Sequence, residues 1–370
     1  MKKPLIALAA AALSPTLASA GGLDRSGQGI NIIFEEGDAL LAALAFTSPR
    51  ISGSQAGTNS GNVGKNFFSP ELAYKKALND KWDVALIYDK PFGADIAYSP
   101  SYILSNFPPV PGGPVDPNTR LSADADTDAL TGLARYKFNN GFSGIGGVRL
   151  VRSTTKVTVP AVGNYEVESD AQYDFGYVVG VAWEKPEIAA RVALTYNSKV
   201  TIDFDQTETI GVAGITVNSQ SQVELPQSVN LDFQTGVAQD TLVFGTIRWV
   251  DWPQLEYDPP NYPFTEPLVS YEDSIWTFSL GLGRSFTDEF AGAITVGYEP
   301  SNDVPQSNLS PTDGFWNIGI GGTYTLENAK ISGGIRYTDI GDATTTTGGE
   351  FKDNHAWSVG FQVTYALGNS

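Results

Sequence analysis

The stretch AARVALTYNSKVTIDF, from Ala189 to Phe204, determines the fold that the sequence predicts. Its residues alternate in character, with a repeat of two that is typical of a β-strand. One face is apolar and carries Val192, Leu194, Tyr196, Val200, Ile202 and Phe204, whereas the other carries Arg191, Thr195, Asn197, Lys199, Thr201 and Asp203. At roughly 3.3 Å per residue the stretch would span about 50 Å, far more than the five or six residues usual in soluble domains. We therefore expect a tilted strand that crosses a membrane and continues above it.

The same pattern recurs along the chain, and tight turns such as Asn79-Asp80-Lys81 alternate with longer loops. About fourteen such strands predict an all-β fold, a 14-stranded antiparallel transmembrane β-barrel over residues 38–367, because only a closed barrel satisfies the backbone of strands in lipid. Aromatic residues near the strand ends fit interface girdles: Trp82, Tyr136, Trp183, Trp316, Tyr324, Trp357 and Tyr365. The longer, outer loops are expected near 52–68, 97–118, 160–168, 206–222, 258–270, 300–313 and 341–353.

The first residues indicate export. Lys2 and Lys3 precede an apolar run from Leu5 to Leu13, and Ala18-Ser19-Ala20 provides small residues for cleavage. We interpret residues 1–20 as a signal peptide, since the apolar run falls short of the roughly 20 residues that an uncleaved membrane helix needs. Export and a barrel together place the protein in the outer membrane of a Gram-negative bacterium. Residues 21–37 then either fold into the lumen as a hatch or form a frayed terminus or short first strand.

Composition excludes several kinds of function. The chain has no cysteine, and His355 is its only histidine, so thiolate metal sites are excluded and a hydrolytic triad would have to use that one residue. The formal charge of −18 argues against nucleic acid as a partner, because phosphate binding needs a basic face. We expect no enzymatic activity, no cofactor and no metal.

Two segments suggest where a ligand would pass. Lys90-Pro91-Phe92-Gly93 interrupts the third strand, and because proline cannot donate to a β-ladder we expect a local break in the wall there. The following loop is apolar, with Tyr102, Ile103, Leu104 and Phe107. These residues could form an external landing patch for hydrophobic molecules or pack on the rim as a lid.

Charged residues leave alternatives open. Asp124, Asp126 and Asp128 share one face of a strand and could collect a cation, or simply line a solvated lumen or rim. Arg149, Arg191, Lys199 and Arg336 belong to the faces expected to point inward, where they could meet a carboxylate head group. The other interpretation is that they pair with luminal carboxylates such as Asp203 and Asp232.

Several segments, in order and spacing, resemble the outer-membrane long-chain fatty acid transporter family (FadL/TodX type): ALTYNSKVTIDF, ELPQSVNL, IRWVDWPQLEY, DVPQSNLSPTDGFWNIGIGGTY and GIRYTDIG. The resemblance covers nearly the whole mature chain and implies a monomeric barrel whose N-terminal hatch, Gly21 to Gly37, plugs the lumen. It also implies capture at the outer loops, a luminal pocket near the hatch residues Ile30, Ile33 and Phe34, and lateral exit at a kink formed by Phe92 and Gly93. The chain departs from the family in its shorter hatch, which lacks an Asn-Pro-Ala signature.

The function that the sequence favours is passive uptake of hydrophobic compounds, most of all long-chain fatty acids, with aromatic hydrocarbons as a further possibility. The partners expected are therefore a hydrophobic small molecule and the lipid of the outer membrane. The alternative is a general aqueous porin with a partial plug.

Overall fold

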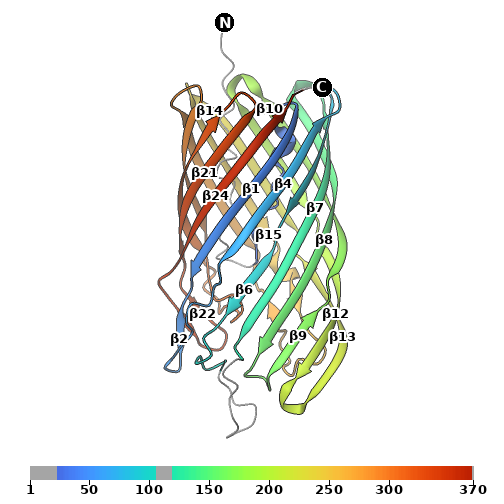
Figure 1. The fold of residues 1–370 in the computed structure, drawn as a ribbon, viewed down its shortest axis with the longest axis vertical. Coiled ribbons are helices and arrows are strands. Elements are labelled where there is room, and N and C mark those ends of the chain that lie inside the picture. The colour runs from blue at the N-terminus through green and yellow to red at the C-terminus, as the bar shows by residue number, and fades with distance from the viewer. Residues whose placement is uncertain (1–22, 106–118, 369–370) are drawn as a thin grey trace.

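The computed structural model describes residues 23–105 and 119–368 and shows a closed, antiparallel barrel of fourteen strands, as the alternation predicts (Figure 1). The expected signal peptide and Phe107 lie outside the described residues. In order around the wall, the strands are β1 (Asp38–Arg50), β4 (Phe67–Ala77), β5 (Trp82–Asp89) with β6 (Gly93–Ala97), β7 (Ser122–Lys137), β8 (Phe142–Val159), β9 (Tyr165–Ser169) with β10 (Gln172–Lys185), β11 (Ala190–Asn197) with β12 (Val200–Ile210), β13 (Ile215–Leu225) with β14 (Ser228–Ala238), β15 (Thr241–Val250), β18 (Ile275–Ser285), β19 (Phe290–Glu299), β20 (Phe315–Thr325), β21 (Ala329–Ile340) and β24 (Asn354–Leu367).

The first and last strands close the barrel. β1 pairs with β24 from Asp38↔Leu367 to Arg50↔His355, and its other edge pairs with β4. Closure leaves no free sheet edge, which is the condition for strands to stand in lipid. Among the described residues, no helix is long and apolar enough to span a membrane.

The two ends of the barrel differ. Short turns gather at the end that holds the C-terminus, and the long loops lie at the opposite end (Figure 1). There, β2 (Gly53–Gln55), β3 (Thr58–Asn59), β22 (Ala343–Thr344) and β23 (Glu350–Phe351) form a small sheet, and β16 (Glu256–Tyr257) pairs with β17 (Val269–Ser270). We call this the loop end and the other the turn end.

One expected outer loop is largely strand. β12 and β13 pair from Val200↔Leu225 to Ile210↔Ile215, so that only a turn at 211–214 remains of the loop expected at 206–222. β9 likewise pairs with β8 and β12 inside the range 160–168. The expectation of a loop was wrong there. The exposed face of these residues is mostly polar, which resembles a loop, but their Thr and Val residues have the β-propensity that a ladder needs.

An apolar band surrounds the wall toward the turn end. Its large side chains are 40–67% exposed, among them Leu44, Leu72, Phe175, Val359 and Phe361. So much exposed apolar surface is incompatible with water and is what lipid-facing strands require.

In part of the wall, the strand face that points into the lumen changes from the polar face to the apolar face partway along the strand. In β11, Val192 and Leu194 are exposed, but in β12 Ile202 and Phe204 are buried in the interior and Asp203 is exposed. Asn197 and Val200 both face inward although they are three residues apart, because Ser198-Lys199 forms an irregularity between the two segments. The sequence prediction of one continuous outer apolar face for Ala189 to Phe204 is therefore wrong in its second half.

Neighbouring strands reverse at comparable interruptions. Tyr165 and Val167 of β9 face inward, whereas Tyr173 and Phe175 of β10 face outward. On the other side of β11 and β12, Val223 and Leu225 of β13 are buried, whereas Val229 of β14 lies on the outer side of its strand. Toward the loop end this part of the barrel thus has an apolar interior and a polar exterior, the opposite of its membrane part.

Candidate functional site

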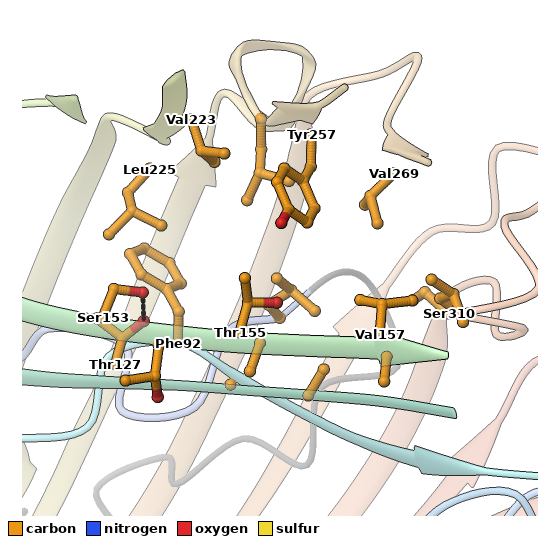
Figure 2. A pocket seen from close by; sticks show the side chains of 18 of the residues that line it. Phe92, Thr127, Ser153, Thr155, Val157, Val223, Leu225, Tyr257, Val269 and Ser310 are labelled. Atoms are coloured by element: carbon orange, nitrogen blue, oxygen red, sulfur yellow. Dashed lines mark hydrogen bonds between the residues drawn. The ribbon is translucent and has the colours of Figure 1, made fainter. Parts of the chain in front are cut away.

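An apolar pocket occupies the lumen on the loop-end side of this reversal. Its lining residues surround about 720 Å³ of free space, part of which is open to solvent. Figure 2 shows Val223, Leu225 and Tyr257 across from Ser153, Thr155 and Val157, with Phe92 near Leu225. The pocket is apolar because β12 and β13 turn Phe204, Val223 and Leu225 inward here.

The described residues that line the pocket include no acidic or basic side chain. Its polar groups are hydroxyls, and two of them, on Thr127 and Ser153, lie 3.4 Å apart and are hydrogen-bonded to each other (Figure 2). Burial raises the pKa of Tyr271 to about 12, and burial together with the nearby Glu208 raises the pKa of Tyr257 further. Both phenols therefore stay neutral, and the pocket carries no formal charge.

The wall beside the pocket is interrupted where the sequence predicts. β5 ends at Asp89 and β6 begins at Gly93. The ladder between β4 and β5 stops at Leu72↔Tyr88, and β6 has no rung with β4, since it pairs with β7 and contacts residues 63–65 instead. The expectation of a break in strand three is confirmed, and the outer half of β4 has no strand partner on this side.

The N-terminal segment, Leu23 to Gly37, takes the place of β4 at the break. The Gly93 amide donates to the Leu23 carbonyl at 2.8 Å, and the Arg25 amide donates to the Pro91 carbonyl at the same distance. A bridge between Asp24 and Phe92 lies between these two bonds. The backbone of the break is thereby hydrogen-bonded from within the barrel.

The side chain of Arg25 lies in the break itself. Its guanidinium lies 3.5 Å from the centre of the Phe67 ring on β4, its Nε donates to the Gly93 carbonyl at 3.0 Å, and its terminal nitrogen lies 3.0 Å from Asp95 Oδ2. A Cβ at Gly93 would lie 3.1 Å from the Ala125 carbonyl oxygen and 3.4 Å from Arg25 Nε. Glycine at position 93 therefore leaves room for Arg25 to join the two sides of the break.

A second pocket of about 580 Å³ adjoins both the first pocket and the break. It shares Leu23, Gly93 and Ala94 with the first and extends to Phe67. The two pockets are therefore neighbours, and the second reaches Phe67 on the unpaired part of β4.

A polar network beneath the pocket anchors the N-terminal segment. Arg248 of β15 donates to Asp24 at 2.5 Å and to Gln28 at 3.2 Å, and it also bonds Ser228 and Asn230. Asn230 in turn donates to the Gly27 carbonyl at 2.9 Å. Because the segment also bonds the break in strand three, it is held to different walls of the lumen.

The predicted hatch residues do not line either pocket. Ile30, Ile33 and Phe34 are buried in a separate apolar cluster toward the turn end, around η2 (Asn31–Phe34). The guanidinium groups of Arg135 and Arg191 lie 4.9 Å and 4.5 Å from the Phe34 ring centre. These residues pack the segment into the barrel and do not meet the apolar cavity.

The predicted head-group cations Arg149, Arg191 and Lys199 line neither pocket. Arg149 donates to Thr131 at 2.9 Å and to Asn197 at 3.0 Å, and Arg191 lies against Phe34. Lys199 is on the outer face, 2.6 Å from Glu224, because the reversal turns position 199 away from the lumen. The structure therefore does not bring these cations together.

The apolar loop residues pack on the rim. Tyr102 is fully buried, 4.8 Å from the Tyr98 ring, and donates to Gln55 at 2.9 Å. Ile103 and Leu104 are partly buried against the same upper core. For these three residues the geometry corresponds to the lid alternative.

The three aspartates lie on the outside of the wall. Asp126 is 2.8 Å from Lys90, and Asp128 is 3.1 Å from Arg152. Asp124 is exposed beside Asp95 in the register of β6 and β7. No group of three potential metal ligands occurs among the residues that the structure describes.

Sequence reasoning predicted Phe92 and Gly93 at the break but missed Arg25 and most of the pocket lining. Arg25 bonds Gly93, 68 positions away, and Asp24 bonds Arg248, 224 positions away. No local pattern in the sequence reveals contacts over such separations. For Leu225 a signal was present, since Pro226 directly after it marks the interruption at which the strand changes face.

Comparisons with known proteins agree with this architecture. No protein-family model matches the sequence, and no curated protein matches it. Among solved structures, a Pseudomonas aeruginosa FadL homologue has a TM-score of 0.71 at 13% identity and covers 90% of this chain and 91% of its own. The P. putida toluene transporter TodX has a TM-score of 0.66 at 12% identity, with 91% of each chain covered. The Ralstonia pickettii toluene transporter TbuX has a TM-score of 0.65 at 12% identity, with 90% of each chain covered. The chain therefore shares its fold with FadL-type outer-membrane barrels.

Proposed function

We propose that this protein is an outer-membrane channel for the passive uptake of hydrophobic compounds. The observation that carries the proposal is an uncharged apolar pocket placed beside an interruption of the barrel wall. A ligand that is sparingly soluble in water gains free energy by burying apolar surface in such a pocket, roughly 25 cal/mol per Å². The fold shared with FadL-type and toluene transporters is consistent with this function.

The proposed route leads from the loop end into the first pocket, through the second pocket, and out of the wall between β4 and β6. Straight passage down the lumen is opposed by the N-terminal segment, which acts as the hatch. Below it, Lys75, Asp83 and Arg135 are buried and paired, with Lys75 and Arg135 at 3.1 Å and 3.2 Å from Asp83. Lateral exit avoids moving an apolar ligand through this charged layer.

Long-chain fatty acids and aromatic hydrocarbons are the substrates to test first. The sequence favoured fatty acids, and similar folds occur in proteins described as a FadL homologue and as toluene transporters. A monomer is the proposed assembly, as the resemblance to the FadL family implies. No catalytic role is proposed for any residue.

The test is uptake of labelled oleate and labelled toluene by Gram-negative cells that lack their own hydrophobic channel, with and without this protein at matched surface level. Saturable uptake of either compound supports the proposal. The Pro91→Val/Gly93→Val double variant should reduce it strongly, since it allows strand three to continue and places a side chain against Arg25. Gly132→Val, where a Cβ has no atom within 4 Å, is the matched control and should transport normally.

The alternative is an aqueous porin with a partial plug. It would be favoured by steady conductance in planar bilayers that deletion of residues 21–37 does not raise, together with no uptake of either hydrophobic compound.

A further inference from the structure

The chemistry of the pocket bears on the charge of its ligand. A fatty acid is ionised at neutral pH, and transferring its carboxylate into an apolar site without a partner is strongly unfavourable. Binding such a ligand therefore needs a cation or several donors aimed at the head group. The pocket offers hydroxyls, two of which already bond each other, and no cation among its described lining residues.

The nearest cations belong to the second pocket, and their surroundings are acidic. Arg25 is already paired with Asp95 and stacked on Phe67. Lys65 is exposed to solvent at the mouth, on the side where Asp95 and Asp124 lie. An anion leaving between β4 and β6 would have to displace the carboxylate of Asp95 from Arg25.

We infer that the pocket selects uncharged hydrophobic molecules, such as hydrocarbons and long-chain alcohols, over carboxylates of the same chain length. This inference rests on the proposed function and narrows its substrate class. The luminal arginines Arg149 and Arg248 are each hydrogen-bonded to protein groups, and neither of them lines the pocket.

The test is a competition experiment on the purified, detergent-solubilised full chain. N-phenyl-1-naphthylamine, a neutral fluorescent hydrophobe, is bound to saturation and then displaced by 1-dodecanol or by dodecanoate at pH 8. We expect dodecanol to displace the probe at a concentration at least about tenfold lower, given the cost of burying an unpaired carboxylate. Lowering the pH toward the ordinary carboxyl pKa, about 4 to 5, should shrink this ratio because the acid then binds in its neutral form.

The second part of the test adds a charged side chain to the pocket. Thr155→Lys places an ammonium among the lining residues and should bring the two competitors to within about threefold or reverse their order. Thr158→Lys, on the outer face of the same strand, is the matched control and should leave the ratio unchanged. Migration as a compact, heat-modifiable species on gels checks that each variant is folded.

Three outcomes separate the possibilities. Preference for dodecanol, lost in Thr155→Lys, supports the inference. Equal or better displacement by dodecanoate in the unaltered protein at pH 8 overturns it, and a further loss of that displacement in Lys65→Gln would assign the head group to the second pocket. Absence of any saturable probe binding removes the pocket as a ligand site, and with it both the proposed function and the inference.

Discussion

Replacement of Arg248 by methionine tests whether the N-terminal segment closes the lumen. The guanidinium is buried and bonds Asp24 at 2.5 Å and Gln28 at 3.2 Å on the segment, as well as Ser228 and Asn230 on the wall. Removing it leaves the Asp24 carboxylate buried without its partner, which costs about 3–5 kcal/mol when a buried ion pair is broken. Because about 1.4 kcal/mol is a tenfold change, the detached form of the segment should become roughly 10² to 4 × 10³ times more populated.

The assay is conductance of the purified protein in planar bilayers, with sensitivity of cells to a large hydrophilic antibiotic as a second readout. Arg248→Met should show frequent open events and raised sensitivity. Asp24→Asn/Arg248→Met should recover much of the closure, because no uncompensated carboxylate remains in the double variant. Arg284→Met, which changes an exposed arginine, is the control. Conductance of folded Arg248→Met equal to that of the unaltered protein would refute the anchoring role.

Three further variants address other parts of the molecule. Arg25→Ala removes the link between Phe67 and Asp95 across the break, so uptake of a hydrophobic probe should become faster at equal surface level; slower uptake would contradict this. Glu208→Ala removes the acceptor of four hydrogen bonds, from Tyr165, Ser219 and both nitrogens of Asn261, and should destabilise the loop around 258–270 by roughly 2–4 kcal/mol, seen as faster proteolysis there. Lys199→Gln breaks only an exposed pair and should change neither uptake nor the melting temperature; a clear loss of uptake would return Lys199 to the ligand path.

The alternation predicted the number of strands and their approximate limits because each strand has one face in an apolar medium and one in a polar medium. Proline and glycine at 91 and 93 likewise predicted the break, since a missing amide donor acts locally. Both features depend on a few neighbouring residues, which the sequence shows directly.

The reversal of faces could not be predicted in the same way. Val192, Leu194, Val200, Ile202 and Phe204 are all at even positions, so the alternation continues without a change of phase. The irregularity at Ser198 and Lys199 turns the strand over just where the exterior changes from lipid to water, and the apolar residues remain in an apolar environment. A period of two shows that the faces differ, but not which face is inside.

Because the reversal could not be predicted, the pocket was not predicted either, and Lys199 was expected on the wrong face. With the reversal in β9 to β14 known, Phe204, Val223 and Leu225 are assigned to the pocket lining and Lys199 to the exterior. The placement of Arg25 and Asp24 depended instead on long-range contacts of a short terminal segment, which carries no periodic pattern.

Because of the reversal, the barrel wall separates two apolar compartments. One is the bilayer around the turn-end half, and the other is the cavity inside the loop-end half. The break in strand three lies where one compartment gives way to the other, so the proposed lateral exit would let a solute pass between them without crossing an aqueous layer. Transfer then resembles partition between two solvents in contact, and its direction is set by the concentration of the compound on each side. On this view a single extra residue per strand, repeated in neighbouring strands, is what converts a membrane barrel into a junction between two nonaqueous phases.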